Sequence, residues 1–218
     1  MGIENLDRII SRLREHKKGA VLPSVSDIAL MNGSPFKILI STVISLRTRD
    51  KVTLEASLRL FEKASDPSSM AALNASEIEK LIYPAGFYKR KAVQIKEISR
   101  IIAEDYSSIV PESVDQLTGL PGVGRKTANL TVGLGYGIHA LCVDTHVHRI
   151  ANRMGWVATK TPEKTEYALT AVLPEKYWIE INELLVIFGQ TVCTPQSPRC
   201  SSCDFASFCP KKGVEKFR

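Results

Sequence analysis

The chain has 218 residues, of which 44% are hydrophobic and 24% charged, as in ordinary soluble proteins of one large or two small domains. No apolar run approaches the roughly 20 residues that a membrane span needs. The first residues mix acids with bases and lack an apolar core, so we expect no signal peptide, no membrane partner and a cytoplasmic location. The net charge of +6 fits a polyanionic partner but does not require one.

Apolar residues recur at helical spacing along almost the whole chain. Ser34 followed by Pro35 predicts the start of a helix over "FKILISTVISLR", because Ser is a good N-cap and Pro suits the first helical position. Asp50 is expected to cap the next helix, "KVTLEASLRLFEKA". The first apolar stripe of the chain consists of Ile3, Leu6, Ile9, Ile10 and Leu13.

Later segments continue the helical pattern. Asn74 with Glu77 resembles a capping box for "SEIEKLIYPA", which is expected to stop at Gly86. Ser113 with Gln116 predicts the cap of a short helix. Further helical segments are "KRKAVQIKEISRIIAEDY", "THVHRIANRM", "PEKTEYALTAVL" and "KYWIEINELLVIFGQ". No run alternates at period two between hairpin turns, so the sequence predicts an all-α fold.

Four of the five cysteines lie together in a segment poor in aliphatic residues, with the spacing Cys193-x6-Cys200-x2-Cys203-x5-Cys209. Disulfides are uncommon in cytosolic proteins, so this spacing favours a metal site. Structural zinc sites usually have two close cysteine pairs, whereas only one pair is close here. The spacing therefore favours a four-thiolate iron–sulfur cluster and leaves zinc as the alternative. Cys142, in "IHALCV", is expected to be a buried thiol.

The stretch "LPGVGRKTANL" joins a glycine-rich turn to the start of a helix. Gly122 and Gly124 permit a tight hairpin and let the backbone approach a ligand closely. The N–H groups at a helix start bind anions, and a DNA phosphate is a natural occupant. Such a phosphate would supply the negative charge that this end of the helix favours, which accounts for Arg125. A contact of this kind positions a protein on DNA without reading the base sequence.

Lys126 follows Arg125, and both the positive helix end and the neighbouring cation disfavour its ammonium form. A neutral lysine is a nucleophile that can form Schiff bases, whereas the alternative is a solvated surface lysine. Asp144, in "VDTHVHR", is a good N-cap for the helix that follows and can also serve as a fixed carboxylate. His146 and His148 are two residues apart, so they do not face one way as metal ligands, and we expect surface or packing roles.

The motifs "LPGVGRKTAN" and "VDTHVHR", followed by the four cysteines, resemble the endonuclease III family. Its members are helix-hairpin-helix DNA glycosylase/AP lyases with an iron–sulfur cluster. The resemblance covers nearly the whole chain and implies a monomer of two helical domains. A six-helix barrel with the hairpin would span residues 28–138. Residues 1–27 plus 139–218 would form the second domain, which carries the cluster loop.

The resemblance implies a base excision repair enzyme that binds double-stranded DNA containing oxidised pyrimidines or abasic sites. The damaged nucleotide would be flipped out of the duplex, because its sugar is inaccessible inside the stack. Lys126 would attack C1′ and expel the base, while Asp144 would stabilise positive charge on the sugar or help keep the lysine neutral. The resulting Schiff base would permit β-elimination, which cleaves the strand 3′ to the abasic site.

A [4Fe-4S] cluster would cross-link the C-terminal loop, so that the loop presents basic residues to DNA. The cluster would have no role in bond cleavage. Its ligands by resemblance would be Cys193, Cys200, Cys203 and Cys209. Arg47 in "SLRTRD" and Phe87 in "GFYKRK" would fill the gap left by the flipped base. The best-known bacterial member has Gln and Leu there, so lesion range and opposite-base preference stay open. The DNA-contacting residues implied in total are Leu120, Gly122, Val123, Gly124, Arg125, Arg47 and Phe87.

Several alternatives stay open beside this interpretation. Arg47 could be a solvated loop charge and Phe87 a core aromatic. Adenine mismatch glycosylases need a catalytic Glu in an early helix, and "FKILISTVISLRTRD" has none. Thymine-mismatch relatives lack the lysine that Lys126 provides. A non-catalytic DNA-binding or redox-sensing module is the remaining class, and the presence of both Lys126 and Asp144 favours the enzyme.

Overall fold

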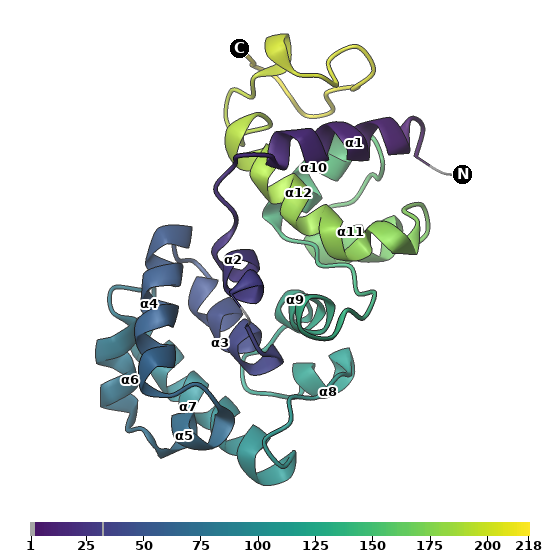
Figure 1. Ribbon diagram of the computed structural model, residues 1–218. Helices are drawn as coiled ribbons and strands as arrows, with labels where there is room; N and C mark the ends of the chain where they lie inside the picture. Colours follow the sequence, from purple (N-terminus) through teal and green to yellow (C-terminus); the bar gives the residue numbers. More distant parts are fainter. Residues whose placement is uncertain (1–2, 32) are drawn as a thin grey trace. The chain divides into compact units, whose positions relative to one another are not determined.

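The computed structural model describes residues 3–31 and 33–218, and every regular element within them is helical (Figure 1). The prediction of an all-α fold is therefore confirmed. The chain divides into two compact units. One is continuous and runs from Pro23 to Ala140, whereas the other joins the residues up to Leu22 to Leu141–Arg218. None of the helices in the described residues is both long and apolar enough to cross a membrane.

The continuous unit is built around one helix that is buried on almost all sides. This central helix, α3, is buried from Phe36 to Ile44 apart from Lys37, as expected for so apolar a segment. It contacts α2, α4, α7 and α9, so most of the unit packs on it. The described helices of this unit are α2 (Ser24–Leu30), α3 (Pro35–Ser45), α4 (Asp50–Lys63), α5 (Pro67–Ala72), α6 (Ala75–Ile82), α7 (Tyr88–Asp105), α8 (Val114–Thr118) and α9 (Arg125–Tyr136).

Three predicted helix starts in this unit are confirmed by their hydrogen bonds. The Ser34 hydroxyl accepts the backbone N–H of Lys37 at 3.3 Å at the start of α3. Glu77 accepts the backbone N–H of Asn74 at 2.8 Å, which is its half of the predicted capping box. Ser113 is the N-cap of α8 and accepts an N–H from within the first turn.

The predicted role of Asp50 is wrong. Arg49 occupies the N-cap position of α4, and Asp50 is the first helical residue. The Asp50 carboxylate instead accepts the backbone N–H and the hydroxyl of Ser24 at 3.1 and 3.0 Å, so it stabilises the start of α2. The expected stop of α6 at Gly86 is also wrong, because Pro84 disfavours a helical conformation in the residue before it and α6 ends at Ile82.

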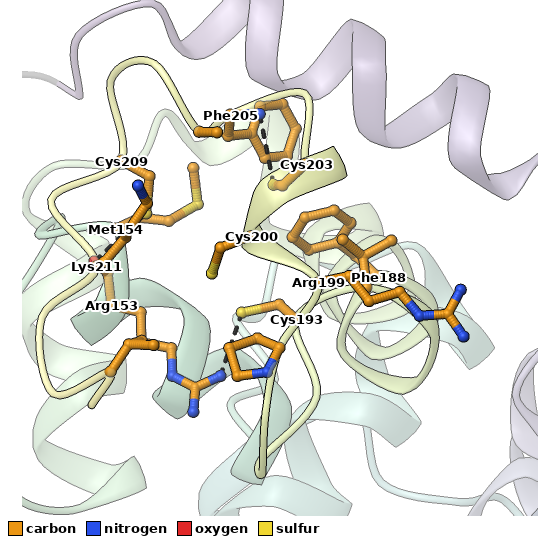
Figure 2. Close-up of a pocket in the computed structure, with 14 residues that line it drawn as sticks. Arg153, Met154, Phe188, Cys193, Arg199, Cys200, Cys203, Phe205, Cys209 and Lys211 are labelled. Carbon is orange, nitrogen blue, oxygen red and sulfur yellow. Dashed lines mark hydrogen bonds between the residues drawn. The ribbon is translucent and has the colours of Figure 1, made fainter. Parts of the chain in front are cut away.

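The second unit is centred on α12, whose side chains are buried from Ile181 to Gly189 apart from Glu183. Beyond α12 the chain forms a loop in which four cysteines line one pocket (Figure 2). The described helices of this unit are α1 (Leu6–Lys17), α10 (Thr145–Arg153), α11 (Pro162–Thr170) and α12 (Trp178–Thr191), with short 3-10 turns at Glu175–Tyr177 and Cys200–Ser202.

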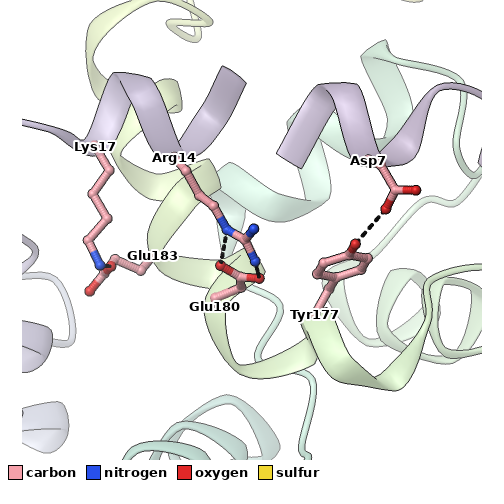
Figure 3. Close-up of polar contacts among 6 residues, drawn as sticks. All are labelled: Asp7, Arg14, Lys17, Tyr177, Glu180 and Glu183. Atoms are coloured by element: carbon pink, nitrogen blue, oxygen red, sulfur yellow. Dashed lines mark hydrogen bonds and ion pairs between the residues drawn. The ribbon is translucent and has the colours of Figure 1, made fainter. Parts of the chain in front are cut away.

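Helix α1 lies along α12 (Figure 1) and is held mainly by its apolar stripe. The predicted members Leu6, Ile9, Ile10 and Leu13 are buried in the core of this unit. Polar contacts follow the same interface (Figure 3), where Arg14 donates to both carboxylate oxygens of Glu180 at 3.0 and 2.6 Å. The Arg14 side chain is half exposed, so solvent screens this pair and it contributes less to stability than one buried isoleucine. The other pairs are Lys17–Glu183 and Asp7–Tyr177.

Candidate functional site

The segment predicted to bind phosphate forms a tight turn between α8 and α9. The N–H of Val123 donates to the Leu120 carbonyl at 3.1 Å, and Gly122 has φ +66°, a conformation that favours glycine. Gln94 of α7 supports the turn, because its Nε2 donates to the Pro121 carbonyl at 2.9 Å. A Cβ atom on Gly122 would lie 2.6 Å from the same nitrogen. The backbone conformation therefore favours glycine here, and any side chain at this position would displace the amide of Gln94.

The residues of this turn that are predicted to contact DNA differ in their exposure. Leu120 and Val123 are each 4% exposed and belong to the core of the continuous unit. Only their backbone groups are therefore available to a ligand, while their side chains anchor the turn. Gly124 is exposed, and a Cβ atom there would meet nothing within 4 Å. The outer side of the turn is therefore open to the approach of another molecule.

Helix α9 begins directly after this turn with an unusual charge distribution. Its N-cap is Gly124, which has no side chain to accept a hydrogen bond, and its first turn contains no acidic residue. Arg125 and Lys126 occupy that first turn and are partly exposed. A helix start with these features favours an anion. The predicted phosphate site and the predicted nucleophile therefore lie in the first turn of one helix.

Asp144 is the N-cap of α10, as predicted. Its Oδ1 accepts the backbone N–H groups of His146 and Val147 at 2.8 and 2.9 Å, so the carboxylate is held in one position. Both predicted packing histidines are partly buried. The Nδ1 of His148 lies 2.6 Å from the Thr165 hydroxyl, and burial lowers the pKa of His148 below its ordinary value.

The two residues expected to fill the gap in the duplex lie next to each other. The guanidinium carbon of Arg47 is 5.6 Å from the centre of the Phe87 ring, a cation–π distance. Phe87 is 60% exposed, which excludes the alternative of a core aromatic. Both residues have positive φ, at 54° and 58°. They line one cavity of about 380 Å³, which is completed by Leu46, Arg90, Lys91, Gln94 and Gly122.

The four clustered cysteines line one pocket, together with Arg153, Phe188 and Phe205 (Figure 2). None of these cysteines forms a disulfide. Burial raises the pKa of the Cys203 and Cys209 thiols, and the neighbouring sulfurs raise it further. In residues 3–31 and 33–218, no three His, Cys, Asp or Glu side chains are close enough together to hold a single metal ion. Cys142 is 2% exposed and stands apart from the pocket, as predicted.

Two arginines of α10 hold the beginning of the cysteine loop, and the sequence reasoning missed both. Arg153 donates to the carbonyls of Thr194 and Pro195, each at 2.7 Å, and to the Cys193 sulfur at 3.4 Å. Arg149 donates to the Cys193 carbonyl at 2.9 Å. The signal for this pair was their spacing of four residues on one helix face.

Comparisons with known proteins agree with this arrangement. Residues 40–175 match the model of the HhH-GPD superfamily base excision DNA repair protein. Endonuclease III of Thermotoga maritima is 50% identical over 175 residues, which cover 80% of this chain and 82% of that protein. Endonuclease III of Bacillus subtilis is 34% identical over 207 residues, covering 92% and 94%.

A solved non-covalent endonuclease III–DNA complex has a TM-score of 0.81 to this structure and 32% sequence identity, and the match covers 94% of this chain and 95% of that one. Because the match covers 94% of this chain, the likeness extends over both compact units. The chain belongs to the HhH-GPD superfamily and, within it, to the endonuclease III family of DNA glycosylase/AP lyases.

Proposed function

We propose that this protein removes oxidised pyrimidines from duplex DNA through a Schiff base on Lys126 and then cleaves the strand at the abasic site. The observation that carries this proposal is the position of Lys126 in the first turn of α9, directly after an open glycine-rich turn. A phosphate held at that turn brings the neighbouring sugar within reach of a lysine in the same turn. A related solved structure, with a TM-score of 0.77 and 35% identity, is a trapped endonuclease III–DNA covalent intermediate.

The proposed reaction starts with the neutral amine of Lys126. Its Nζ attacks C1′ of the flipped nucleotide, the C1′–N bond breaks, and the base departs with the bonding electrons and gains a proton. Loss of a proton from nitrogen and opening of the sugar ring give the Schiff base. The Schiff base acidifies the C2′ protons, so removal of one of them expels the 3′ phosphate by β-elimination.

Asp144 has a separate role in this proposal. Its carboxylate stabilises the positive charge that develops on the sugar as the base departs. Two backbone N–H groups already hold Oδ1, so the charge is preorganised before the substrate binds. The hairpin backbone and Arg125 bind phosphates, while Arg47 and Phe87 fill the gap in the stack. The protein acts as a monomer, with double-stranded DNA that contains oxidised pyrimidines or abasic sites as its partner.

The cysteine loop holds a [4Fe-4S] cluster in this proposal, and the donor set fits that group. Four cysteines line one pocket and none of them forms a disulfide, and four thiolates are the donor set that such a cluster takes. When bound, the cluster would cross-link the loop, with no part in bond cleavage. The continuous unit is then the hairpin domain, and the discontinuous unit is the cluster domain.

Incubating the native protein with a thymine-glycol duplex and sodium borohydride is expected to give a covalent protein–DNA adduct, because borohydride reduces the Schiff base to a stable amine. A denaturing gel detects the adduct as a slowly migrating species. An undamaged duplex of the same sequence serves as the control. A non-catalytic binding module would retain the damaged duplex in a native gel and give no adduct, and that outcome would contradict the proposal.

The substitution Asp144→Asn is expected to slow base release by about 10²-fold while duplex affinity stays close to native, because the carboxylate acts on charge that develops during the reaction. Asn is also a good N-cap, so the substitution keeps α10 intact. Single-turnover kinetics and a binding titration measure the two quantities separately. An equal loss of rate and affinity would indicate that Asp144 serves only as a cap.

A further inference from the structure

Lys91, on α7, is 4% exposed although lysine is rarely buried. Its Nζ donates to the carbonyls of Ile44 and Leu46, each at 2.6 Å, and to the Thr48 hydroxyl at 2.9 Å. The two carbonyls lie at the C-terminal end of α3, where a positive charge is favoured. Burial lowers the pKa of Lys91 to about 8, so the ammonium form predominates at neutral pH with all three of its protons donated.

A second hydrogen bond continues from Lys91 to another loop. The Thr48 hydroxyl also accepts the backbone N–H of Gly86 at 3.0 Å. A Cβ atom on Gly86 would lie 2.4 Å from the Arg47 carbonyl oxygen, so only glycine lets the two loops approach this closely. The chain of contacts from Lys91 through Thr48 to Gly86 therefore ties the loop of Arg47 to the loop of Phe87.

Thr48 and Gly86 each lie next to a residue with an unfavourable backbone conformation. Thr48 follows Arg47 and Gly86 precedes Phe87, and both outliers have positive φ. This conformation is unfavourable for residues with a Cβ atom and persists only where the surroundings hold it. The hydrogen bonds of Lys91 and Thr48 are well placed to hold it, because they fix the backbone on the adjacent side of each outlier.

We propose that Lys91 and Thr48 are positioning residues that hold Arg47 and Phe87 together as one rigid wedge for duplex DNA. This inference rests on the proposed function. A wedge is needed only where a nucleotide, with or without its base, leaves a stacked duplex, because a single strand has no opposite base and no gap to fill. The positioning residues therefore govern reaction with a duplex and not with an abasic site in a single strand.

The test compares the rate of borohydride trapping on an abasic duplex with the rate on the same abasic strand alone. We expect Thr48→Val to lower the duplex rate about tenfold, the scale of losing a hydrogen bond to a charged group, and to leave the single-strand rate unchanged. Thr48→Ser keeps the hydroxyl and is expected to restore the native duplex rate. Lys91→Met is expected to act like Thr48→Val.

A matched control comes from the same helix. Lys96 of α7 donates to one carbonyl, that of Leu73 at 2.7 Å, so Lys96→Met also removes a lysine–carbonyl bond and is expected to leave both rates unchanged. Equal losses on duplex and single strand in Thr48→Val would overturn the wedge role, and so would native rates on both. A native protein that traps neither substrate would overturn the proposed function itself.

Discussion

Replacing Lys126 with alanine is expected to abolish the borohydride-trapped adduct and to slow base release by about 10³-fold or more, the scale of losing an enzyme's nucleophile. Alanine has no amine, so no Schiff base forms at this position. Duplex affinity is expected to stay within about tenfold of native, because in the proposed function the open turn at Gly124 binds phosphate through its backbone, which the substitution keeps. Trapping, single-turnover base release and a binding titration measure the three quantities.

Two further variants make this result specific. Lys126→Arg keeps a positive charge in the first turn of α9, but a guanidinium stays protonated, so no adduct is expected. Lys164→Ala removes an exposed lysine from the first turn of α11 and is expected to trap like the native protein. An adduct that persists in Lys126→Ala would place the nucleophile elsewhere and refute its assignment.

Cys203→Ser removes one ligand of the proposed cluster and is expected to lower the free energy of unfolding by at least about 3 kcal/mol, because a structural metal group contributes its binding energy to folding. For a chain of this size, that loss lowers the melting temperature by about 6–12 °C. Beyond Cys193 the described loop buries only the side chains of Pro198 and Phe205, so it has little apolar core of its own. Iron and sulfide analysis, visible absorption and thermal unfolding measure the effect.

The fifth cysteine offers a control for this experiment. Cys142 is buried but lies outside the pocket, so Cys142→Ala is expected to keep the iron content and the colour of the native protein. Limited proteolysis is expected to cut the loop of Cys203→Ser first and to leave that of Cys142→Ala intact. A colourless native protein with one bound zinc ion would refute the iron–sulfur assignment.

The predictions that succeeded from the sequence alone depend on atoms close together along the chain. Ser34 bonds three residues ahead and Asp144 two and three residues ahead, so each cap is contained in a short window of sequence. Asp50 could cap a helix by the same reasoning, but its actual partner, Ser24, lies 26 residues earlier. A competing partner so distant in sequence cannot be recognised from the residues around Asp50.

The candidate site shows the same difference between contacts that are close in sequence and contacts that are distant in sequence. The glycine turn and Lys126 were identified from one segment of sequence, because the chemistry and the helix start occur together. The supports of the site could not be identified in this way. Gln94 reaches Pro121 across 27 residues, and Lys91 reaches Ile44 across 47. The adjacency of Arg47 and Phe87 likewise came from the family resemblance and not from any periodicity.

Because one unit is discontinuous in sequence, its two parts leave the ribosome at different times during synthesis. Arg14 and Glu180 are 166 residues apart, so α1 emerges long before the helix on which it packs. At ordinary translation speeds the delay is about 10–30 seconds. The continuous unit can fold within that interval, whereas the apolar stripe of α1 stays uncovered until α12 has been made. Helix α1 is therefore made early but is among the last helices of its unit to be packed, and its apolar stripe is exposed in the nascent chain.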